Sequence, residues 1–119
     1  MKKRYYDALT EPMLYVLMAL SSQERCGTEI AVFAEGRTAG WVTLGPGTLY
    51  TILAKFEAAG LIQETAVLGR KRTYMLTEHG REHYQAELER LRRCLKDAAA
   101  TEHEAPVPST GNNEIPIWL

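Results

Sequence analysis

The sequence has few cysteines and no long apolar run. Among its 119 residues, Cys26 and Cys94 stand alone and form no CxxC pair. This excludes a disulfide framework and points to reduced, structural thiols. The longest apolar run, Met13 to Leu20, is far too short to cross a bilayer. The basic start is followed by two tyrosines and Asp7 rather than by an apolar segment with a cleavage site, so we expect a cytoplasmic protein.

Motifs for catalysis and for metal binding are also lacking. No Gly-rich nucleotide loop follows a predicted strand, no nucleophile sits in a recognisable elbow, and no pair of carboxylates lies in an apolar setting. His79 and His83 are four residues apart on a predicted helix, but no convincing third ligand accompanies them. We therefore expect no enzyme, no metal and no cofactor.

The chain has no excess of positive charge. Its net charge is −1, which argues mildly against a nucleic-acid binder. The placement of the cations weakens this objection, because residues 2–4 and 70–72 form two basic clusters while the acids are spread out. With 45% hydrophobic residues, the chain has material for one small core and little to spare, so dimerisation would add what a monomer lacks.

The most informative stretch runs from Leu44 to Gly60. Gly45 fits the N-cap of a helix, Pro46 its first position, and Gly60 a left-handed C′ residue. One stripe is apolar and predicts packing on a core, whereas the opposite face has short, nearly uncharged side chains that suit close approach to a DNA major groove. A plain amphipathic helix is the alternative. The residues expected to meet DNA are Gly47, Thr48, Tyr50, Thr51 and Lys55.

A β-hairpin is predicted directly after this helix. Leu61–Thr65 is expected to form one strand, Leu68–Lys71 the turn and Arg72–Leu76 the returning strand. A helix followed by a hairpin is typical of a winged helix. We expect the cluster Arg70, Lys71 and Arg72 to contact phosphates.

The remaining elements of the domain are predicted from caps and apolar patterns. A helix begins after the capping residue Thr10 and is apolar as far as Leu20, and a second helix is expected over Gly27–Glu35. Gly36–Gly40 is expected to be a loop. We predict that Trp41–Thr43 is a short strand that pairs with the hairpin.

The last predicted helix begins after Thr77 and runs to about Ala100. Its apolar residues recur at spacings of four and three, as in a coiled coil: Tyr84, Leu88, Leu91, Leu95 and Ala98. At roughly 34 Å, this helix is longer than the small domain can cover, so we expect a second copy to pack against it. The resulting twofold dimer would place two reading helices about 34 Å apart on double-stranded DNA and predicts a pseudo-palindromic operator.

Three blocks of the sequence resemble the PadR-like family of transcriptional regulators: LTEPMLYVLMAL at Leu9–Leu20, LGPGTLYTILAKFEAAGLI at Leu44–Ile62 and RTYMLTEHGR at Arg72–Arg81. The resemblance covers roughly residues 1 to 100. It implies a homodimeric, DNA-binding repressor or activator whose C-terminal helix makes the dimer. The chain departs from the family at Cys26-Gly27-Thr28, where His-Gly-Tyr is common, so the packing of that aromatic ring is not carried over.

The family resemblance also suggests a small-molecule effector. Family members of this short type often respond to small aromatic molecules, and some hold them between tryptophans of the last helix. This chain has no tryptophan there, so that clamp is not carried over. A soft apolar pocket remains possible, and its candidate residues are Tyr5, Tyr6, Met13, Tyr15 and Tyr84.

Together these features predict a mainly α fold with a small β-hairpin. Residues 1–77 are expected to form a winged helix-turn-helix domain, 78–100 a dimerisation helix, and 101–119 an extended tail whose apolar end, residues 115–119, docks on a groove of the dimer. The predicted function is that of a homodimeric DNA-binding regulator, a repressor relieved by a small aromatic or apolar effector. A winged-helix protein–protein adaptor and a ligand-sequestering dimer are the alternatives.

Overall fold

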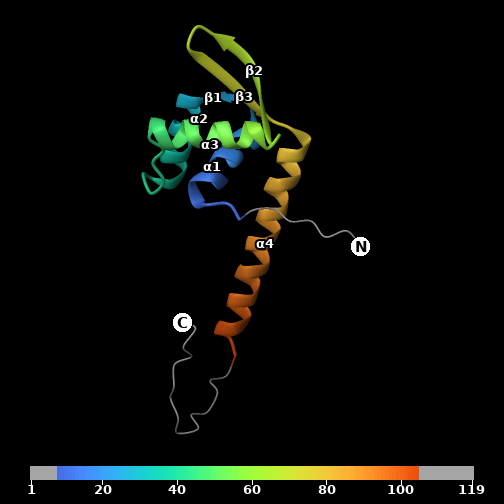
Figure 1. Ribbon diagram of the computed structural model, residues 1–119. Coiled ribbons are helices and arrows are strands. Elements are labelled where there is room, and N and C mark those ends of the chain that lie inside the picture. The colour runs from blue at the N-terminus through green and yellow to red at the C-terminus, as the bar shows by residue number, and fades with distance from the viewer. Residues whose placement is uncertain (1–7, 105–119) are drawn as a thin grey trace.

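A computed structural model describes residues 8–104 as four helices and a three-stranded antiparallel sheet with strand order β1-β3-β2 (Figure 1). The elements are α1 (Glu11–Ser22), β1 (Arg25–Cys26), α2 (Gly27–Thr38), α3 (Pro46–Ala58), β2 (Ile62–Leu68), β3 (Lys71–Leu76) and α4 (Glu78–Glu102). The predicted mainly helical fold with a small hairpin and a long last helix is confirmed. The predictions for Tyr5, Tyr6 and residues 115–119 fall outside the described residues.

Helix α1 is the centre of the core. Its start is set by Thr10, whose hydroxyl oxygen accepts a hydrogen bond from the Met13 N–H at 3.3 Å, so the predicted cap is confirmed. Val16, Leu17 and Ala19 have no exposed surface. Because α2, α4 and β3 all pack against α1, its apolar side chains fix how these elements meet.

Helix α3 begins and ends where its sequence predicts. Gly45 is the N-cap, Pro46 is the first helical residue, and Gly60 has the left-handed φ of 77°. The Leu61 N–H donates to the Phe56 carbonyl at 2.9 Å, and the Gly60 N–H donates to the Glu57 carbonyl at 3.0 Å. This pair of bonds is a Schellman motif, which turns the chain sharply from α3 into the hairpin.

The third strand of the sheet differs from the prediction. Arg25–Cys26 forms β1 and pairs with Thr73 and Tyr74 of β3, so the predicted strand at Trp41–Thr43 is wrong. The reason is that Thr38, at the end of α2, accepts the backbone N–H groups that such a strand would use for pairing. The Trp41 N–H donates to the Thr38 carbonyl at 3.1 Å and the Val42 N–H to the Thr38 hydroxyl at 2.8 Å.

Several predicted boundaries also move by a few residues. Helix α2 continues through the expected loop to Thr38, and left-handed Ala39 at φ 53° ends it. Helix α1 extends to Ser22, and α4 continues past Ala100 to Glu102. Helix ends fray and their last turn is often irregular, so a sequence pattern does not fix the terminal residue of a helix.

The hairpin of β2 and β3, which we call the wing, contains a β-bulge. The Gly69-Arg70 turn joins strands in which Leu68 faces Lys71 and Val67 faces Arg72. Between Glu64 and Ala66 the register shifts by one residue, so Glu64 faces Tyr74. Since neighbouring strand residues point to opposite faces, the bulge brings Glu64 to the same face as Arg72 and Tyr74.

Helix α4 leaves the domain through a tight junction with the first residues of the wing. The Thr77 hydroxyl donates to the Gly60 carbonyl at 2.6 Å and accepts from the Gly80 N–H at 3.0 Å, so the predicted cap is confirmed. The Thr77 N–H donates to the Leu61 carbonyl at 3.0 Å. Gly80 lies against the same carbonyl, with no room for a Cβ atom. From this junction α4 first packs against α1, and its second half projects from the domain on the side opposite the wing (Figure 1).

Within residues 8–104, no helix combines the length and apolar character that crossing a membrane requires.

We predict that Gly80→Ala destabilises the protein by about 3 kcal/mol, because the added methyl group collides with the Leu61 backbone, which cannot rotate away. Thermal or urea unfolding followed by circular dichroism measures the change. Gly36→Ala is the matched control, since Gly36 lies inside α2 with nothing near its Cβ position. We expect it to be neutral or stabilising by up to about 1 kcal/mol. Equal stability of the two variants would contradict the account of the junction.

Candidate nucleic-acid interface

One face of α3 is free of the core and carries every residue predicted to meet DNA from this helix. Leu49, Ile52, Leu53 and Phe56 are buried, whereas Gly47, Thr48, Tyr50, Thr51 and Lys55 are all exposed. Nothing lies near the Cβ position of Gly47, so the start of the helix is bare backbone open to a ligand. The Thr51 hydroxyl donates to the Gly47 carbonyl at 2.9 Å, so its oxygen can still accept a hydrogen bond.

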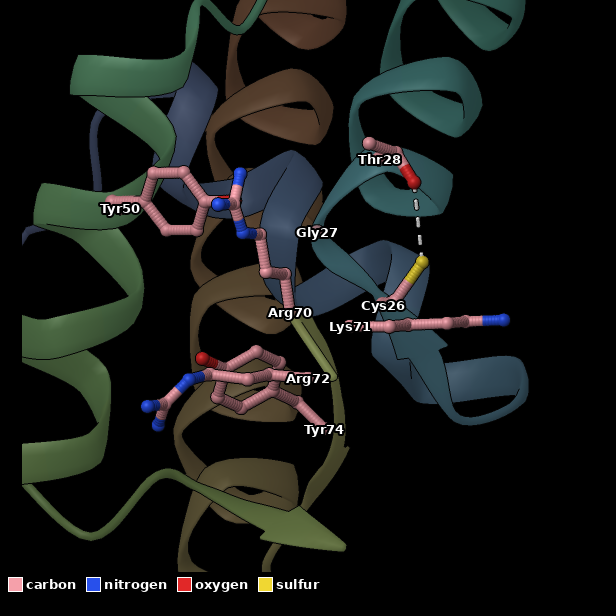
Figure 2. A pocket seen from close by; sticks show the side chains of 8 residues that line it. All are labelled: Cys26, Gly27, Thr28, Tyr50, Arg70, Lys71, Arg72 and Tyr74. Atoms are coloured by element: carbon pink, nitrogen blue, oxygen red, sulfur yellow. Dashed lines mark hydrogen bonds between the residues drawn. The ribbon is translucent and has the colours of Figure 1, made fainter. Parts of the chain in front are cut away.

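A groove of about 530 Å³ separates α3 from the wing. Its lining combines three cations, two tyrosines and the first residues of α2, which Figure 2 shows from close by. The lining residues are Cys26, Gly27, Thr28, Tyr50, Arg70, Lys71, Arg72 and Tyr74. The groove is therefore a basic channel with aromatic walls.

The three wing cations do not act as one cluster. Arg70 and Arg72 point toward the α3 side of the groove, whereas Lys71 points the opposite way, toward the start of α2 (Figure 2). Alternation along β3 explains the difference between Lys71 and Arg72. Consistent with its direction, Lys71 is among the positive charges that help to lower the pKa of Glu29 on α2, although the hydrogen bonds from Cys26 are the main cause.

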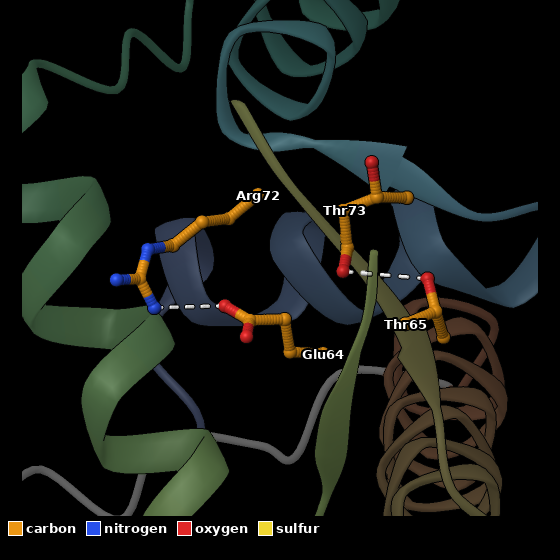
Figure 3. Close-up of polar contacts among 4 residues, drawn as sticks. All are labelled: Glu64, Thr65, Arg72 and Thr73. Atoms are coloured by element: carbon orange, nitrogen blue, oxygen red, sulfur yellow. Dashed lines mark hydrogen bonds and ion pairs between the residues drawn. The ribbon is translucent and has the colours of Figure 1, made fainter. Parts of the chain in front are cut away.

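Arg72 is already paired within the wing. Its Nη1 atom lies 2.8 Å from Glu64 Oε2, on the side of the sheet that faces α3 (Figure 3). The hydrogen bond to Glu64 and the charge of that carboxylate raise the pKa of Arg72 above its ordinary value. The bulge makes this contact possible. Within residues 8–104, Arg72 is the predicted phosphate ligand that forms an ion pair.

Tyr74 forms the base of the groove and is buried. Burial is the main cause that raises the pKa of its hydroxyl, and the negative charges of Glu57 and Glu64 add to the effect. Tyr74 is therefore a neutral hydroxyl over the physiological range, which makes it a wall of the channel rather than a charge.

The start of α2 belongs to the groove, although sequence reasoning did not assign it. Cys26 is 5% exposed, and its Sγ atom lies 3.2 Å from the Thr28 hydroxyl. The Cys26 N–H donates to Glu29 Oε1 at 2.9 Å, which completes one half of a capping box. The usable signal was the Cys-x-x-Glu spacing at a helix start. The sequence analysis placed the third strand at the wrong residues, and it is β1 that brings Cys26 beside β3. The position of Cys26 in the groove was therefore not predicted.

The predicted dimerisation seam divides into two parts. Tyr84 is 7% exposed and Leu88 is half-buried, and both pack against the core of their own chain. Leu91 is half-buried, whereas Leu95 is 71% exposed and Ala98 is also exposed. The outer half of the seam is therefore apolar and uncovered.

Of the residues predicted to line an effector pocket, those within residues 8–104 lie in the core or against it. Met13 and Tyr84 are part of the core cluster and Tyr15 packs against it. None of them lines the groove between α3 and the wing. Among residues 8–104, no group of three or more His, Cys, Asp or Glu side chains is placed to hold a metal ion.

Comparison with known protein families decides the assignment of the fold. Residues 16–86 match the family described as Transcriptional regulator PadR-like family, which is more than half of the chain. The chain belongs to this family. PadR-like proteins are transcriptional regulators and not enzymes, so the expectation of a transcriptional regulator is confirmed. No curated protein sequence matches the chain.

Solved structures show the same fold. A transcriptional regulator from Clostridium thermocellum has a TM-score of 0.64 and 22% identity, over 79% of this chain and 90% of that one. A PadR family regulator from Clostridium difficile has a TM-score of 0.65 and 21% identity, over 77% and 98%. RosR of H. salinarum has a TM-score of 0.61 and 24% identity, over 80% and 97%. This PadR-like chain therefore spans nearly the full length of these structures.

We predict that Glu64→Gln increases the affinity of the protein for polyanions. The substitution removes a negative charge from the groove and releases the Arg72 guanidinium, which the carboxylate holds at 2.8 Å. The salt concentration that elutes the protein from a heparin column measures this, and we expect it to rise. Glu89→Gln, an exposed position on α4, is the control with the same change in net charge. Equal shifts for both variants would show that Glu64 does not restrain Arg72.

Proposed function

We propose that the protein is a homodimeric repressor that binds a pseudo-palindromic DNA operator in the cytoplasm. The observation that carries this proposal is the exposed, small and nearly uncharged face of α3 beside a groove lined by three cations. An ordinary solvated helix face would carry more charge. The described residues form a winged-helix domain and one long helix. A protein with these two parts would repress most simply by covering a promoter.

The dimensions of DNA fit this arrangement. A major groove about 12 Å wide admits α3, with Tyr50, Thr51 and Lys55 facing base edges. The wing then lies over the adjacent minor groove. Because a sugar–phosphate strand separates the two grooves of DNA, it would pass through the channel between α3 and the wing. Arg70 and the start of α2 would contact that strand from two sides.

The dimer is supported by the uncovered part of α4. Leu91, Leu95 and Ala98 recur at coiled-coil spacing on a helix whose remaining surface is mostly polar. A second copy is the simplest partner for such a seam, since a twofold axis makes the same residues complementary to themselves. The winged-helix domain would then be repeated at a fixed distance along the DNA.

Relief by a small aromatic or apolar effector is the regulatory part of the proposal. Its support is that Met13 and Tyr84 lie in the core cluster, Tyr15 packs against it, and α1 contacts α4. A molecule bound in this part of the core would change the angle between the domain and the dimer helix. Such a molecule must lower the affinity for the operator. A compound that raises the melting temperature and leaves that affinity unchanged would instead favour a ligand-sequestering dimer.

We predict that α3 and the wing contribute differently to DNA binding. Lys55→Ala should weaken binding to the operator by about 1 to 3 kcal/mol and leave binding to random DNA nearly unchanged. Neutralising Arg70, Lys71 and Arg72 together to Gln should weaken binding to any sequence, and the salt slope should fall by about 0.9 for each phosphate that the variant no longer neutralises. Fluorescence anisotropy at several salt concentrations measures both, with DNA from upstream of the protein's own gene.

Lys96→Ala, on the exposed surface of α4, is the control for both variants. An unchanged salt slope in the wing variant would refute the wing assignment. Wild-type binding that is weak and no tighter than to random DNA would refute the regulator and favour a protein–protein adaptor.

We predict that Leu95→Glu converts the protein to a folded monomer. Leu95 is 71% exposed in the isolated chain, so the substitution leaves the domain intact and places charge on the seam. Analytical ultracentrifugation should show half the mass of the wild type, with unchanged circular dichroism. Lys96→Glu, one residue off the seam, should remain a dimer. A Leu95→Glu variant of unchanged mass would exclude this seam as the interface.

A further inference from the structure

The tip of the wing is both apolar and cationic. Leu68 is 75% exposed and Val67 is 50% exposed, although both are large aliphatic residues at the end of a strand. Gly69, with a φ of 61°, and exposed Arg70 form the turn. Neither aliphatic residue belongs to the core cluster. An exposed apolar hairpin tip favours aggregation unless another surface covers it, so these two side chains indicate a contact surface.

The charges beside these residues indicate what that surface is. In the strand register Leu68 faces Lys71 and Val67 faces Arg72, so each face of the tip carries one aliphatic and one cationic side chain. Figure 2 shows Lys71 directed away from Arg70 and Arg72. A flat anionic surface would meet one face of the tip. A narrow groove with anionic walls on both sides and an apolar lining would meet both.

The DNA minor groove has these properties. It is about 6 Å wide, has phosphates along both edges, and is lined by deoxyribose and base edges. The tip is also continuous with the basic groove beside α3, which shares Arg70, Lys71 and Arg72. The minor groove is therefore the occupant that agrees with the charge, the apolar character and the position of the tip.

We propose that Leu68 enters the minor groove beside each half-site and selects against G·C pairs there. This rests on the proposed function. In the minor groove a G·C pair adds the guanine 2-amino group, a donor that A·T pairs lack. Contact with an aliphatic side chain would deprive this donor of water and leave it unsatisfied.

Inosine separates this mechanism from readout in the major groove. An I·C pair lacks the 2-amino group in the minor groove and keeps the major-groove pattern of G·C. The experiment compares three operators with the same half-sites and with A·T, I·C or G·C pairs in the flanks. Anisotropy with the full-length wild-type protein should give nearly equal affinity for the A·T and I·C flanks and roughly tenfold weaker binding to G·C, as expected for a cost of about 1.4 kcal/mol.

Leu68→Ser tests the residue itself. We expect this variant to bind all three operators with nearly equal affinity and to keep the wild-type melting temperature and salt slope. Val32→Ser, at a 71% exposed aliphatic residue on α2, is the matched control and should keep the wild-type preference.

The outcomes distinguish the two proposals. Wild-type affinity for I·C flanks as weak as for G·C, equal affinity for all three flanks, or an unchanged preference in Leu68→Ser would each overturn the role of Leu68. Salt-dependent operator binding would still stand in those cases. Failure of the wild type to prefer the operator over random DNA would overturn the proposed function and this inference together.

Discussion

The geometry of this protein depends on one backbone carbonyl, that of Leu61. It accepts the Thr77 N–H at 3.0 Å and lies against Gly80, where a Cβ atom has no room. The Thr77 hydroxyl bonds in turn to the neighbouring Gly60 carbonyl at 2.6 Å. These contacts join the end of α3, the start of the wing and the first turn of α4. They therefore set the direction in which α4 leaves the domain, and in a dimer that direction decides where the two copies of α3 stand.

The electrostatics of the interface are local. A chain of net charge −1 carries a basic channel because Arg70, Lys71 and Arg72 all line the groove between α3 and the wing. One of these cations is already paired, since Arg72 Nη1 lies 2.8 Å from Glu64 Oε2. This ion pair lowers the positive charge that the channel offers to a phosphate. In the proposed function, the protein would be attracted to phosphate along one edge and not over its whole surface, which would limit binding to nucleic acid at random orientations.

Much of the fold could be predicted because its boundaries depend on local chemistry. Thr10, Pro46, Gly60 and Thr77 each act within a few residues of their own position, and each cap was confirmed. Contacts between distant segments could not be predicted. The strand predicted at Trp41–Thr43 was wrong because Thr38 binds the backbone of Trp41 and Val42, and no local sequence pattern shows this contact. Likewise, the Glu64–Arg72 pair depends on a bulge that changes the register, and the role of Gly80 depends on the carbonyl of Leu61, at the far end of the wing sequence. The roles of the candidate DNA and dimer residues stay predictions.

The central claim is that two copies of α3 read DNA from one face, held apart by α4. Hydroxyl-radical footprinting of the DNA upstream of the protein's own gene tests this most directly. The account predicts two protected regions related by a twofold axis, with centres about 34 Å, or one helical turn, apart on the same face of the duplex. Protection of a single region, or of two regions on opposite faces of the duplex, would contradict the dimer arrangement. Uniform protection without a boundary would contradict sequence-specific binding.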